Sequence, residues 1–469
     1  RISRGRNSEH EPVASVGKCE MTVHNEDGLF SPGNAASRWY PNILPMKKVE
    51  VSCILNGTIN PLFVGYLQRI QPNPRPDQQE CFLDCVDGME ILRLTECRTE
   101  PYQNVNIGTL IGNILDIAGT VYFPSTARVL DNGDLTPQWA FWDRENCLEA
   151  ISQLCESEHG VFYINRGGTA VFERRSHRWG TVHTTGAAAT VNKSMIDLRY
   201  DLDVASVYND ISATTYNRVV GAEAEIWRSD GTTPLLSNGS VSFKCEHNAV
   251  VSTVTTPVFG TSLGTVSPGT ADIVANTAPD GSGSFVMNGT VTLTAKSRSS
   301  DVIVTAGTTC YLTTVRLRGT PLGIGEGETS VAKGTPSGTV YGWRKMPLDF
   351  TWQNRQELAR SITTGLLRRY RDPQPSVSAT LARAAGGTVA FADMLAKEIS
   401  DPVDVTETDT GMGTTRLFIG AVSHEMSEGG EIHTTTWQLE NKGTENYWIL
   451  GLGTLGGPNT NIYTTALGW

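Results

Sequence analysis

Histidines and carboxylates in a few short groups are the residues of this chain that could do chemistry. His424 and Glu425 begin the sequence HEMSE, which lacks the second histidine of a zinc-protease motif, so we expect this pair to lie in a hairpin. His177 and His183 flank Trp179 and could bind a metal ion together, although histidines of a surface loop are the simpler interpretation. Neither group by itself predicts a metal site.

Two groups of carboxylates raise further possibilities. An acidic run offers the oxygen ligands that calcium prefers but lacks the spacing and glycine of an EF-hand, so a solvated loop is expected at Asp401, Asp404, Glu407 and Asp409. Three glutamates near Tyr163 could include the carboxylate pair of a glycosidase, but charge on a helix surface explains them better; they are Glu156, Glu158 and Glu173.

Motifs of the common enzyme classes are also missing. The sequence has no GxxxxGK phosphate loop followed by Ser or Thr, and no GxSxG elbow before a helix. We therefore predict no catalytic, cofactor-binding or metal-binding residue, no cofactor and no enzyme activity.

The nine cysteines include no CxxC pair. Cys81 and Cys85 lie four residues apart in an expected strand, which places them on one face but too far apart for a disulfide. We expect mostly buried thiols, as suits assembly in a reducing cytoplasm, rather than a metal or redox site.

The net charge argues against a dedicated DNA-binding protein. Asp and Glu number 49 against 38 Lys and Arg, which gives a formal charge of −11, whereas nucleic-acid affinity depends on basic residues. Two interpretations remain open: charge that keeps the protein in solution, or an acidic channel wall that repels DNA phosphates. No run of eighteen apolar residues and no signal peptide is evident, so we expect a soluble protein.

The segment 104–175 has the pattern of a module built from two helices and a hairpin. Apolar residues on one face predict the first helix over 107–118, with Asn106 as its N-cap and Gly119 as its left-handed C-terminal cap.

Further elements follow from similar signals. A second helix is predicted to open at Asp143 and close at Gly160, before a hairpin over 161–173. A third helix is predicted over 354–370, and basic residues near its end would complement the helix dipole; they are Arg368, Arg369 and Arg371.

Strand patterns occupy most of the remaining chain. Alternating residues predict strands at 18–23, 48–55, 58–70 and 80–86, with a Pro-rich linker over 72–76. Three later strands are predicted at 377–381, 416–424 and 432–439. Between these sets, a shift towards Thr, Gly, Ser and Val predicts a sandwich of the immunoglobulin or carbohydrate-module type over 221–345.

Several short segments form a recognisable order along the chain: Arg4-Gly5-Arg6, VHNEDGLFSP at 23–32, Tyr40-Pro41-Asn42, Pro45-Met46, LFVGY at 62–66 and the module at 104–175. In this order they resemble tail hub proteins of long-tailed bacteriophages, also called baseplate hub or tail-associated proteins. The chain is thereby also similar to the contractile-phage baseplate hub. The resemblance covers 4–216 and 352–440, with 415–440 as the closing hairpin, whereas 221–345 departs from the family pattern.

The resemblance implies a mainly β fold with α insertions (α+β). We expect tube-like β domains at 1–90 and, with a helix, at 346–441; a helix-helix-hairpin module at 91–182; strands returning to the hub domains at 183–220; a β-sandwich-like decoration domain at 221–345; and a C-terminal arm at 442–469. The two tube-like domains should superpose, which a difference in strand order would contradict. A strand and a longer lead-in would precede Arg1, so the first domain is expected to be incomplete.

The implied function is structural. A homotrimeric ring at the tail tip of the virion, assembled in the host cytoplasm, would present six β domains and so adapt a sixfold tail tube. The implied partners are the distal tail protein ring, the tape-measure protein and a central fibre or spike. DNA would pass through the lumen without specific binding, and the host cell surface would be engaged only indirectly.

Alternatives remain for the whole chain and for two of its segments. A cell-wall hydrolase would need a carboxylate pair or a zinc triad. A receptor- or glycan-binding adhesin would need clustered surface aromatics in the insertion, whose only Trp and Tyr residues are Trp227, Tyr311, Tyr341 and Trp343. The insertion would contact a fibre, a tail protein or a glycan, or merely stabilise the fold. The C-terminal arm would anchor on a neighbour or pack locally through Tyr447, Trp448, Tyr463 and Trp469.

Overall fold

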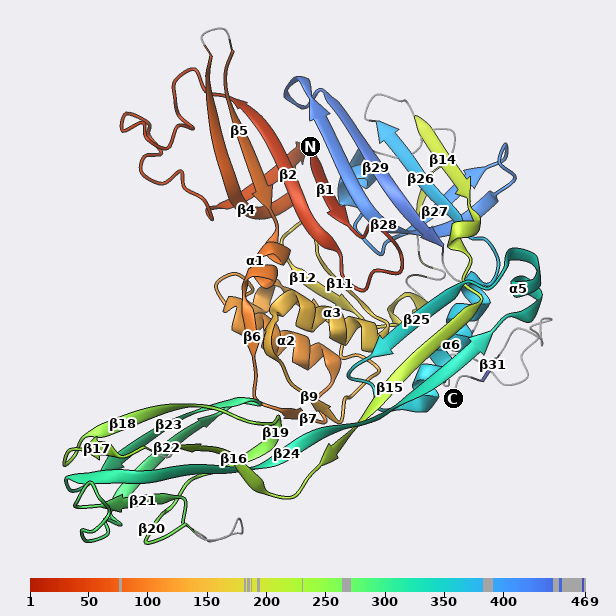
Figure 1. Cartoon of the computed structure of the whole chain (residues 1–469). Coiled ribbons are helices and arrows are strands. Elements are labelled where there is room, and N and C mark those ends of the chain that lie inside the picture. The colour runs from red at the N-terminus through yellow and green to blue at the C-terminus, as the bar shows by residue number, and fades with distance from the viewer. Residues whose placement is uncertain are drawn as a thin grey trace.

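The computed structural model of the chain describes residues 1–75, 78–180, 183, 186, 188–191, 195–229, 231–263, 271–382, 391–441, 447–448 and 466–467. Figure 1 shows a large sheet at the top, a helical module below it and a long β arm that projects to the lower left. The fold is mainly β with α insertions, which confirms the expected fold class.

The large sheet has eleven strands. Its first five are β1 (Ile2–Gly5), β2 (Ser15–His24), β3 (Lys48–Leu55), β4 (Thr58–Arg75) and β5 (Gln78–Val86). The other six are β13 (Ala189–Val191), β14 (Asp197–Leu202), β26 (Pro375–Ala382), β27 (Pro402–Glu407), β28 (Gly413–Ser427) and β29 (Ile432–Asn441). The main order is β14-β26-β29-β28-β1-β2-β5-β4-β3, with β27 on β28 and β13 on β27.

The two halves of this sheet repeat one topology. The order is β3-β4-β5-β2-β1 in the first half and β27-β28-β29-β26-β14 in the second, so chain order gives third, fourth, fifth, second, first in both. All neighbouring pairs within these two sets are antiparallel. The halves join where β1 pairs with β28. The two halves thus have the same strand order, as superposable domains require. The superposition itself stays a prediction.

The prediction of a Pro-rich linker between β4 and β5 is wrong for the part that the structure describes. Pro72 pairs with Cys81 and Pro74 with Gln79, so the two strands form one long hairpin. This end of β4 has β5 on one side, while β3 pairs only with the earlier part of β4. Proline lacks a backbone N–H, and it is tolerated where no second strand needs one.

The helical module contains α1 (Gly88–Leu94), α2 (Ile107–Gly119) and α3 (Cys147–Glu158). The hairpin of β11 (Val161–Ile164) and β12 (Ala170–Glu173) packs beside them, with β8 (Arg128–Leu130) parallel to β12. Short pairs are formed by β6 (Glu96–Arg98) with β10 (Asp143–Asn146) and by β7 (Tyr102–Gln103) with β9 (Trp139–Ala140). Single turns of 3-10 helix lie at Ser125–Ala127, His177–Trp179, Val204–Ser206 and Glu428–Gly430.

The N-terminal signal was read correctly for α2, but Gly119 is the last residue of this helix and Thr120 is its C-cap; both end signals were displaced for α3. Asn106 caps α2 by accepting the amide of Thr109 at 2.9 Å, as predicted. Asp143, the predicted start of α3, lies in β10, and Asn146 caps the helix instead by accepting the amide of Glu149 at 2.8 Å. The left-handed residue is His159 rather than Gly160. The first helix of the module, α1, was not predicted; Asp87 caps it through the amide of Met89.

Two long strands connect the arm to the body. These are β15 (Asp210–Val220) and β24 (Cys310–Lys333), which pair from Asp210↔Lys333 to Val220↔Leu322. At the body end, β15 also pairs in parallel with β25 (Lys345–Phe350), α5 (Thr335–Tyr341) connects β24 to β25, and α6 (Gln356–Tyr370) covers the sheet.

The far part of the arm has two sheets around one apolar core. One sheet uses β24 with β16 (Ala224–Ser229), β17 (Thr233–Leu235), β19 (Val251–Thr255), β20 (Phe259–Gly260) and β21 (Ile273–Asn276). The other contains β18 (Ser240–Glu246), β22 (Gly289–Ala295) and β23 (Ser299–Ala306). Side chains of both sheets, among them Ile273, Val302 and Leu317, are fully buried in this core.

The remaining described elements are small. Helix α7 (Phe391–Ala396) places Met394 in the core of the second half and Leu395 in the core of the first, so it packs against both halves of the large sheet. The strands β30 (Tyr447–Trp448) and β31 (Ala466–Leu467) pair with each other. The rest of the 442–469 segment, with its proposed arm, lies outside the described residues.

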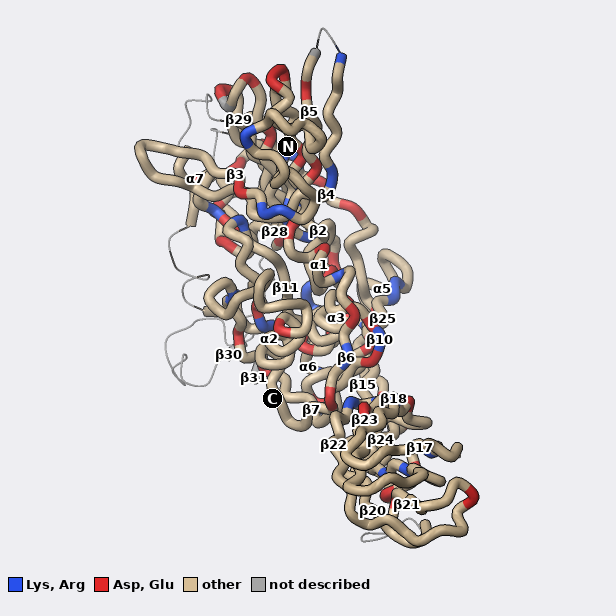
Figure 2. Tube along the Cα trace, turned by 90° about the vertical axis from the view of Figure 1, so that its left-hand side faces the viewer, with Lys and Arg blue, Asp and Glu red and all other residues tan. Residues whose placement is uncertain are grey.

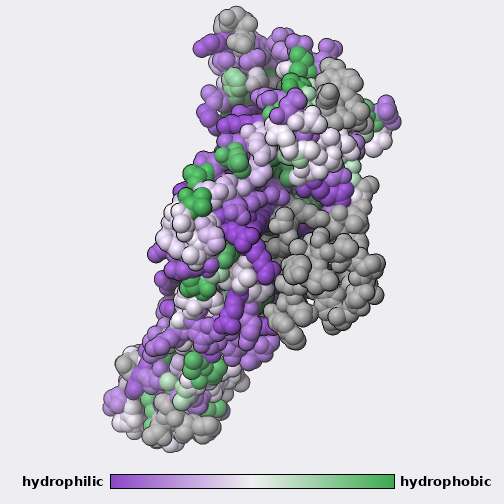
Figure 3. Space-filling model, turned by 90° about the vertical axis from the view of Figure 1, so that its right-hand side faces the viewer, coloured by the Kyte–Doolittle hydropathy of each residue, from purple (hydrophilic) through white to green (hydrophobic). Residues whose placement is uncertain are grey.

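Surface and thiol properties follow the composition. All nine cysteines are unpaired thiols, and eight are buried, as predicted. The face shown in Figure 3 is mostly hydrophilic, with hydrophobic residues in small separate patches. Among the described residues, no helix has the length and apolar character needed to cross a membrane.

Candidate functional site at the junction of the modules

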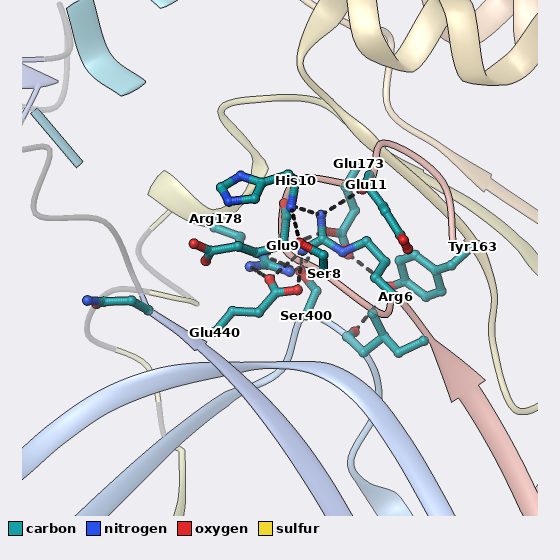
Figure 4. Close-up of polar contacts among 12 residues, drawn as sticks. Arg6, Ser8, Glu9, His10, Glu11, Tyr163, Glu173, Arg178, Ser400 and Glu440 are labelled. Carbon is teal, nitrogen blue, oxygen red and sulfur yellow. Dashed lines mark hydrogen bonds and ion pairs between the residues drawn. The ribbon is translucent and has the colours of Figure 1, made fainter. Parts of the chain in front are cut away.

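The loop between β1 and β2 leaves the large sheet and enters the space between the hairpin and α6. Arg6 donates to the carbonyl oxygens of Glu9 and Glu11, each at 3.2 Å, and holds the loop in a tight turn. Ala14 donates to the carbonyl of Phe162 at 2.8 Å and so ties the loop to β11. We call residues 6–14 the clasp, because they connect both halves of the sheet with the module (Figure 4).

Glu440 is the anionic centre of this junction. Its carboxylate accepts hydrogen bonds from Arg6 of the clasp and from Arg178 of the module, the latter at 2.8 Å. Glu440 is only 9 % exposed. Burial by itself raises the pKa of this carboxyl, but the cations of Arg6 and Arg178 outweigh it and lower the pKa to about 2.

Arg369 adds a second connection to the clasp. Its guanidinium donates to Glu9 and to the carbonyl oxygen of Asn441, both at 2.8 Å. The sequence-based explanation of this arginine as a complement to the helix dipole was therefore incomplete. The cation binds the clasp to the last strand of the sheet.

Glu173 links the hairpin to the second half of the sheet. It accepts a hydrogen bond from the Tyr163 hydroxyl at 2.9 Å and another from Ser400, whose oxygen also accepts from Arg178. Only 4 % of Glu173 is exposed. The expectation of a charge on a helix surface is wrong for this residue, which lies in β12 and carries buried structural hydrogen bonds.

Glu158 is likewise buried rather than a surface charge. Its two carboxylate oxygens accept the backbone amides of Asp134 and Leu135, each at 2.7 Å, at the C-terminal end of α3. Burial raises its pKa to about 7 despite these hydrogen bonds. Because Glu158 and Glu173 are both occupied in this way, the glycosidase pair considered from the sequence has no support; Glu156 is half-buried beside them.

The buried carboxyl of Glu158 predicts a pH-dependent effect of Glu158→Gln. A carboxyl whose pKa is raised in the fold favours folding while it is protonated, and this contribution is lost as pH rises through about 7. The glutamine should cost roughly 1–3 kcal/mol at pH 5, because one backbone amide loses its acceptor, and clearly less at pH 8. Urea unfolding at both pH values measures this; an equal cost at both would contradict the assignment.

The histidine groups have local partners instead of metal-binding geometry. His177 lies 2.8 Å from Asp131 through its Nδ1, and this hydrogen bond raises the pKa of His177, while burial lowers the pKa of His183. We expected His177 to be a free histidine of a surface loop, and this expectation is wrong. In the part of the chain that the structure describes, no three His, Cys, Asp or Glu residues come together as a metal-ion site.

His424 lies in the β28–β29 hairpin, as predicted. Its Nδ1 is 3.1 Å from Nε2 of His433 and 3.0 Å from the Thr435 hydroxyl, and burial with the nearby His433 lowers its pKa to about 3. The sequence analysis missed His433, although cross-strand pairing of the predicted hairpin could have indicated it.

The acidic run forms no cluster and is not a solvated loop throughout. Asp404 and Glu407 lie in β27, and Asp404 makes a bidentate ion pair with Arg416 at 2.7 Å for both contacts. Asp401 accepts the amide of Glu398 at 2.9 Å. Glu407 and Asp409 contact each other only through the amide of Asp409. These contacts give no basis for a calcium site.

An aromatic cluster fastens the module to the segment after β25. Trp142 and Trp352 stack edge-on with ring centroids 5.2 Å apart, and both indole N–H groups donate to Oε1 of Gln153, at 3.1 and 3.2 Å. Phe141 also packs on Trp352, and the Arg218 guanidinium lies 5.0 Å from the ring centroid of Trp352. The sequence analysis did not identify this cluster.

A cavity of about 590 Å³ opens beside the ionic junction. It lies between the clasp, the C-terminal end of α3, the segment after β12, β25 and α6. Cations from four of these segments line it: Arg6, Arg174, Arg175, Arg178, Lys345 and Arg369. The cavity thus combines charged groups from the clasp, the module and α6.

Comparison with known proteins finds similarity only at the level of structure. No family model matches the chain, and no curated protein matches it. The 43 kDa tail protein of prophage MuSo2 from Shewanella oneidensis is 10 % identical with a TM-score of 0.46, over 94 % of this chain and 93 % of its own. The tail protein from Neisseria meningitidis MC58 is 9 % identical with a TM-score of 0.49, over 94 % and 91 %.

A third solved structure has a name of the same kind. The prophage tail protein gp18 from Listeria monocytogenes EGD-e is 10 % identical with a TM-score of 0.38, over 94 % of this chain and 88 % of its own. All three are named as tail proteins, the class whose hub members the sequence resembles.

Proposed function

We propose that the protein is a structural tail hub of a bacteriophage or prophage tail tip, which forms a trimeric ring. The observation that carries the proposal is the repeat of one five-stranded topology in the two halves of the large sheet. Three chains would present six such units, so a threefold ring could dock onto a sixfold tube. The role is steric and conformational, without catalytic chemistry.

In this role the ring gates the passage of the tape-measure protein and DNA. The distal tail protein ring would bind above it, and a central fibre or spike below. DNA would pass without specific binding, in keeping with the net charge of −11. Figure 2 shows acidic and basic residues interspersed through the body. The proposal therefore relies on the negative net charge of the whole chain, and not on a uniformly acidic channel wall.

A contact surface for the ring is available at one end of the sheet. The edge strand β3 forms a hairpin with β4, and Ile54 and Ile59 face each other at its tip while 71 % and 64 % exposed. Paired exposed isoleucines on an edge strand are a recognised site for association with another chain. We propose that this edge contacts the neighbouring subunit.

Solution mass tests the ring. Light scattering of the purified protein should give three times the 50.8 kDa of one chain, and electron microscopy should show a threefold ring with a central hole. The double variant Ile54→Lys/Ile59→Lys should shift the mass towards one chain, because it puts buried charge into the contact. Leu94→Lys, at a residue 65 % exposed on α1, is the matched control. A monomeric mass at the highest attainable concentration would count against the ring.

The adhesin alternative receives less support from the arm. Trp227 packs against Phe243 beside the sandwich core, and Tyr341 and Trp343 belong to the α5 region near the body. Trp227, Tyr341 and Trp343 therefore do not gather on one exposed face of the sandwich, as glycan binding by stacking would require. A structural or protein-contact role of the arm is the better proposal.

A further inference from the structure

The junction cavity contains more cationic hydrogen-bond donors than its own carboxylates occupy. Glu440 accepts from Arg6 and Arg178, Glu9 accepts from Arg369, and Glu173 accepts from Tyr163 and Ser400. Glu11 accepts the backbone amide of Asn7 at 3.0 Å. The carboxylates of the lining are thus already engaged within the protein, Glu156 through a backbone hydrogen bond with Asp349.

Arg175 lines the cavity and makes no ion pair with the carboxylates named above, although its charge acts to lower the pKa of Glu158. Its guanidinium lies 5.7 Å from the ring centroid of Trp179, and its Nε is buried without a hydrogen-bond acceptor. Its neighbour Arg174 forms an ion pair with Asp134 at 3.1 Å. A guanidinium presents five donors in a planar fork that matches a carboxylate or phosphate group.

Two further arginines keep buried donors without an acceptor at the same cavity. These are Nε of Arg6, whose side chain is 5 % exposed, and Nη2 of Arg178. A buried donor without an acceptor is destabilising, so such donors are rare in native proteins unless a water, ion or ligand satisfies them. Arg6, Arg175 and Arg178 thus line one cavity, and each has a buried donor that no acceptor of the described residues satisfies.

The histidine at the cavity wall reports the local potential. His159 has its pKa lowered to about 3, first by burial and then by the cations of Arg175, Arg369 and Arg6. Burial is the larger cause, and the further lowering by three arginines indicates that positive charge acts on this side of the cavity.

We propose that the junction cavity binds an oxyanion, a phosphate or carboxylate group, through Arg175 together with Arg6 and Arg178. At about 590 Å³ the cavity is larger than a single phosphate requires, so it can admit an oxyanion carried on a larger molecule, such as a glutamate side chain of a partner protein. This site is distinct from the ring contact at β3 and does not depend on the proposed function. Binding would also fix the clasp against the module, since Arg6 and Arg178 belong to these two segments.

The test uses the full-length protein with inorganic phosphate and with a triglutamate peptide, each measured against sodium chloride at the same ionic strength. Calorimetric titration should show saturable binding of at least one probe, and Arg175→Gln should weaken it on the order of tenfold or more, because a charge-assisted bidentate contact is lost. Arg93→Gln is the matched control: this exposed arginine pairs with Glu90 on α1, away from the cavity, and the variant should bind as the wild type does.

The outcomes distinguish the sources of the oxyanion. Binding of phosphate alone would assign the site to a free anion, and binding of triglutamate, with or without phosphate, to a carboxylate on a chain; either supports the proposal. Thermal unfolding of Arg175→Gln without probe, close to that of the wild type, would show that the variant folds. Absence of saturable binding of both probes, or equal binding by the wild type and Arg175→Gln, would overturn the proposal.

Discussion

Replacing Glu440 with glutamine should lower the free energy of unfolding at pH 7 by about 3–5 kcal/mol, because a buried ion pair that loses one partner leaves uncompensated charge. Arg6 and Arg178 would both remain in the junction, one in the clasp and one in the module, without a carboxylate between them. The glutamine oxygen can still accept one hydrogen bond but offers no charge. Chemical denaturation followed by circular dichroism measures the change.

The pH dependence gives this prediction a second observable. The pKa of Glu440 is lowered to about 2 in the fold, so its stabilisation is present above the ordinary carboxyl pKa and is lost as pH falls from about 4.5 towards 2. The wild type should lose about 3 kcal/mol over this range through Glu440, and Glu440→Gln should lack that part of the acid sensitivity.

A matched control separates this buried network from ordinary ion pairs. Glu246→Gln removes a carboxylate from a pair with Arg144 in which both side chains are at least 60 % exposed. Exposed pairs contribute about 0–1 kcal/mol, so this variant should behave almost as the wild type. A loss below 1 kcal/mol for Glu440→Gln would show that the junction tolerates neutralisation and would remove it from the set of stabilising centres.

The local signals of the sequence predicted much of the fold because they depend on neighbouring residues. Asn106 could be identified as a cap from the apolar pattern that follows it, and the hairpin at 161–173 from its turn. The start of α3 was misplaced because Asp143 and Asn146 are both competent caps, and only pairing with β6 places Asp143 in a strand. Local chemistry cannot decide between two caps when a distant strand makes the choice.

The candidate site could not be predicted for the same reason. Arg6, Arg178 and Glu440 are far apart in the sequence, and each alone has the pattern of a surface charge. Glu158 and Glu173 were assigned to a helix surface because glutamate is seldom buried without a partner, and their partners come from other elements. The resemblance predicted two similar β domains, but their common strand order could not be known before the pairing of strands.

Truncating Trp352 to alanine should cost about 3–5 kcal/mol, since it removes a large buried ring and leaves a cavity. Trp352 is 5 % exposed, and it is the point at which the segment after β25 packs on the module. The loss should exceed that of Trp352→Phe, which keeps apolar volume and deletes the indole donor to Gln153. Urea unfolding of the two variants measures the difference.

The acceptor shared by the two indoles makes the cluster testable as a unit. The side-chain oxygen of Gln153 accepts hydrogen bonds from both Trp142 and Trp352. The stability losses of Trp142→Phe and Trp352→Phe should therefore be non-additive, because once one donor is gone the other can take the better geometry. Trp343→Ala is the control, because this tryptophan is 52 % exposed and its loss should change stability by no more than about 0.5 kcal/mol. Additive losses from the two phenylalanine variants would mean that the module and the post-β25 segment are held by separate contacts, and that Gln153 does not couple them.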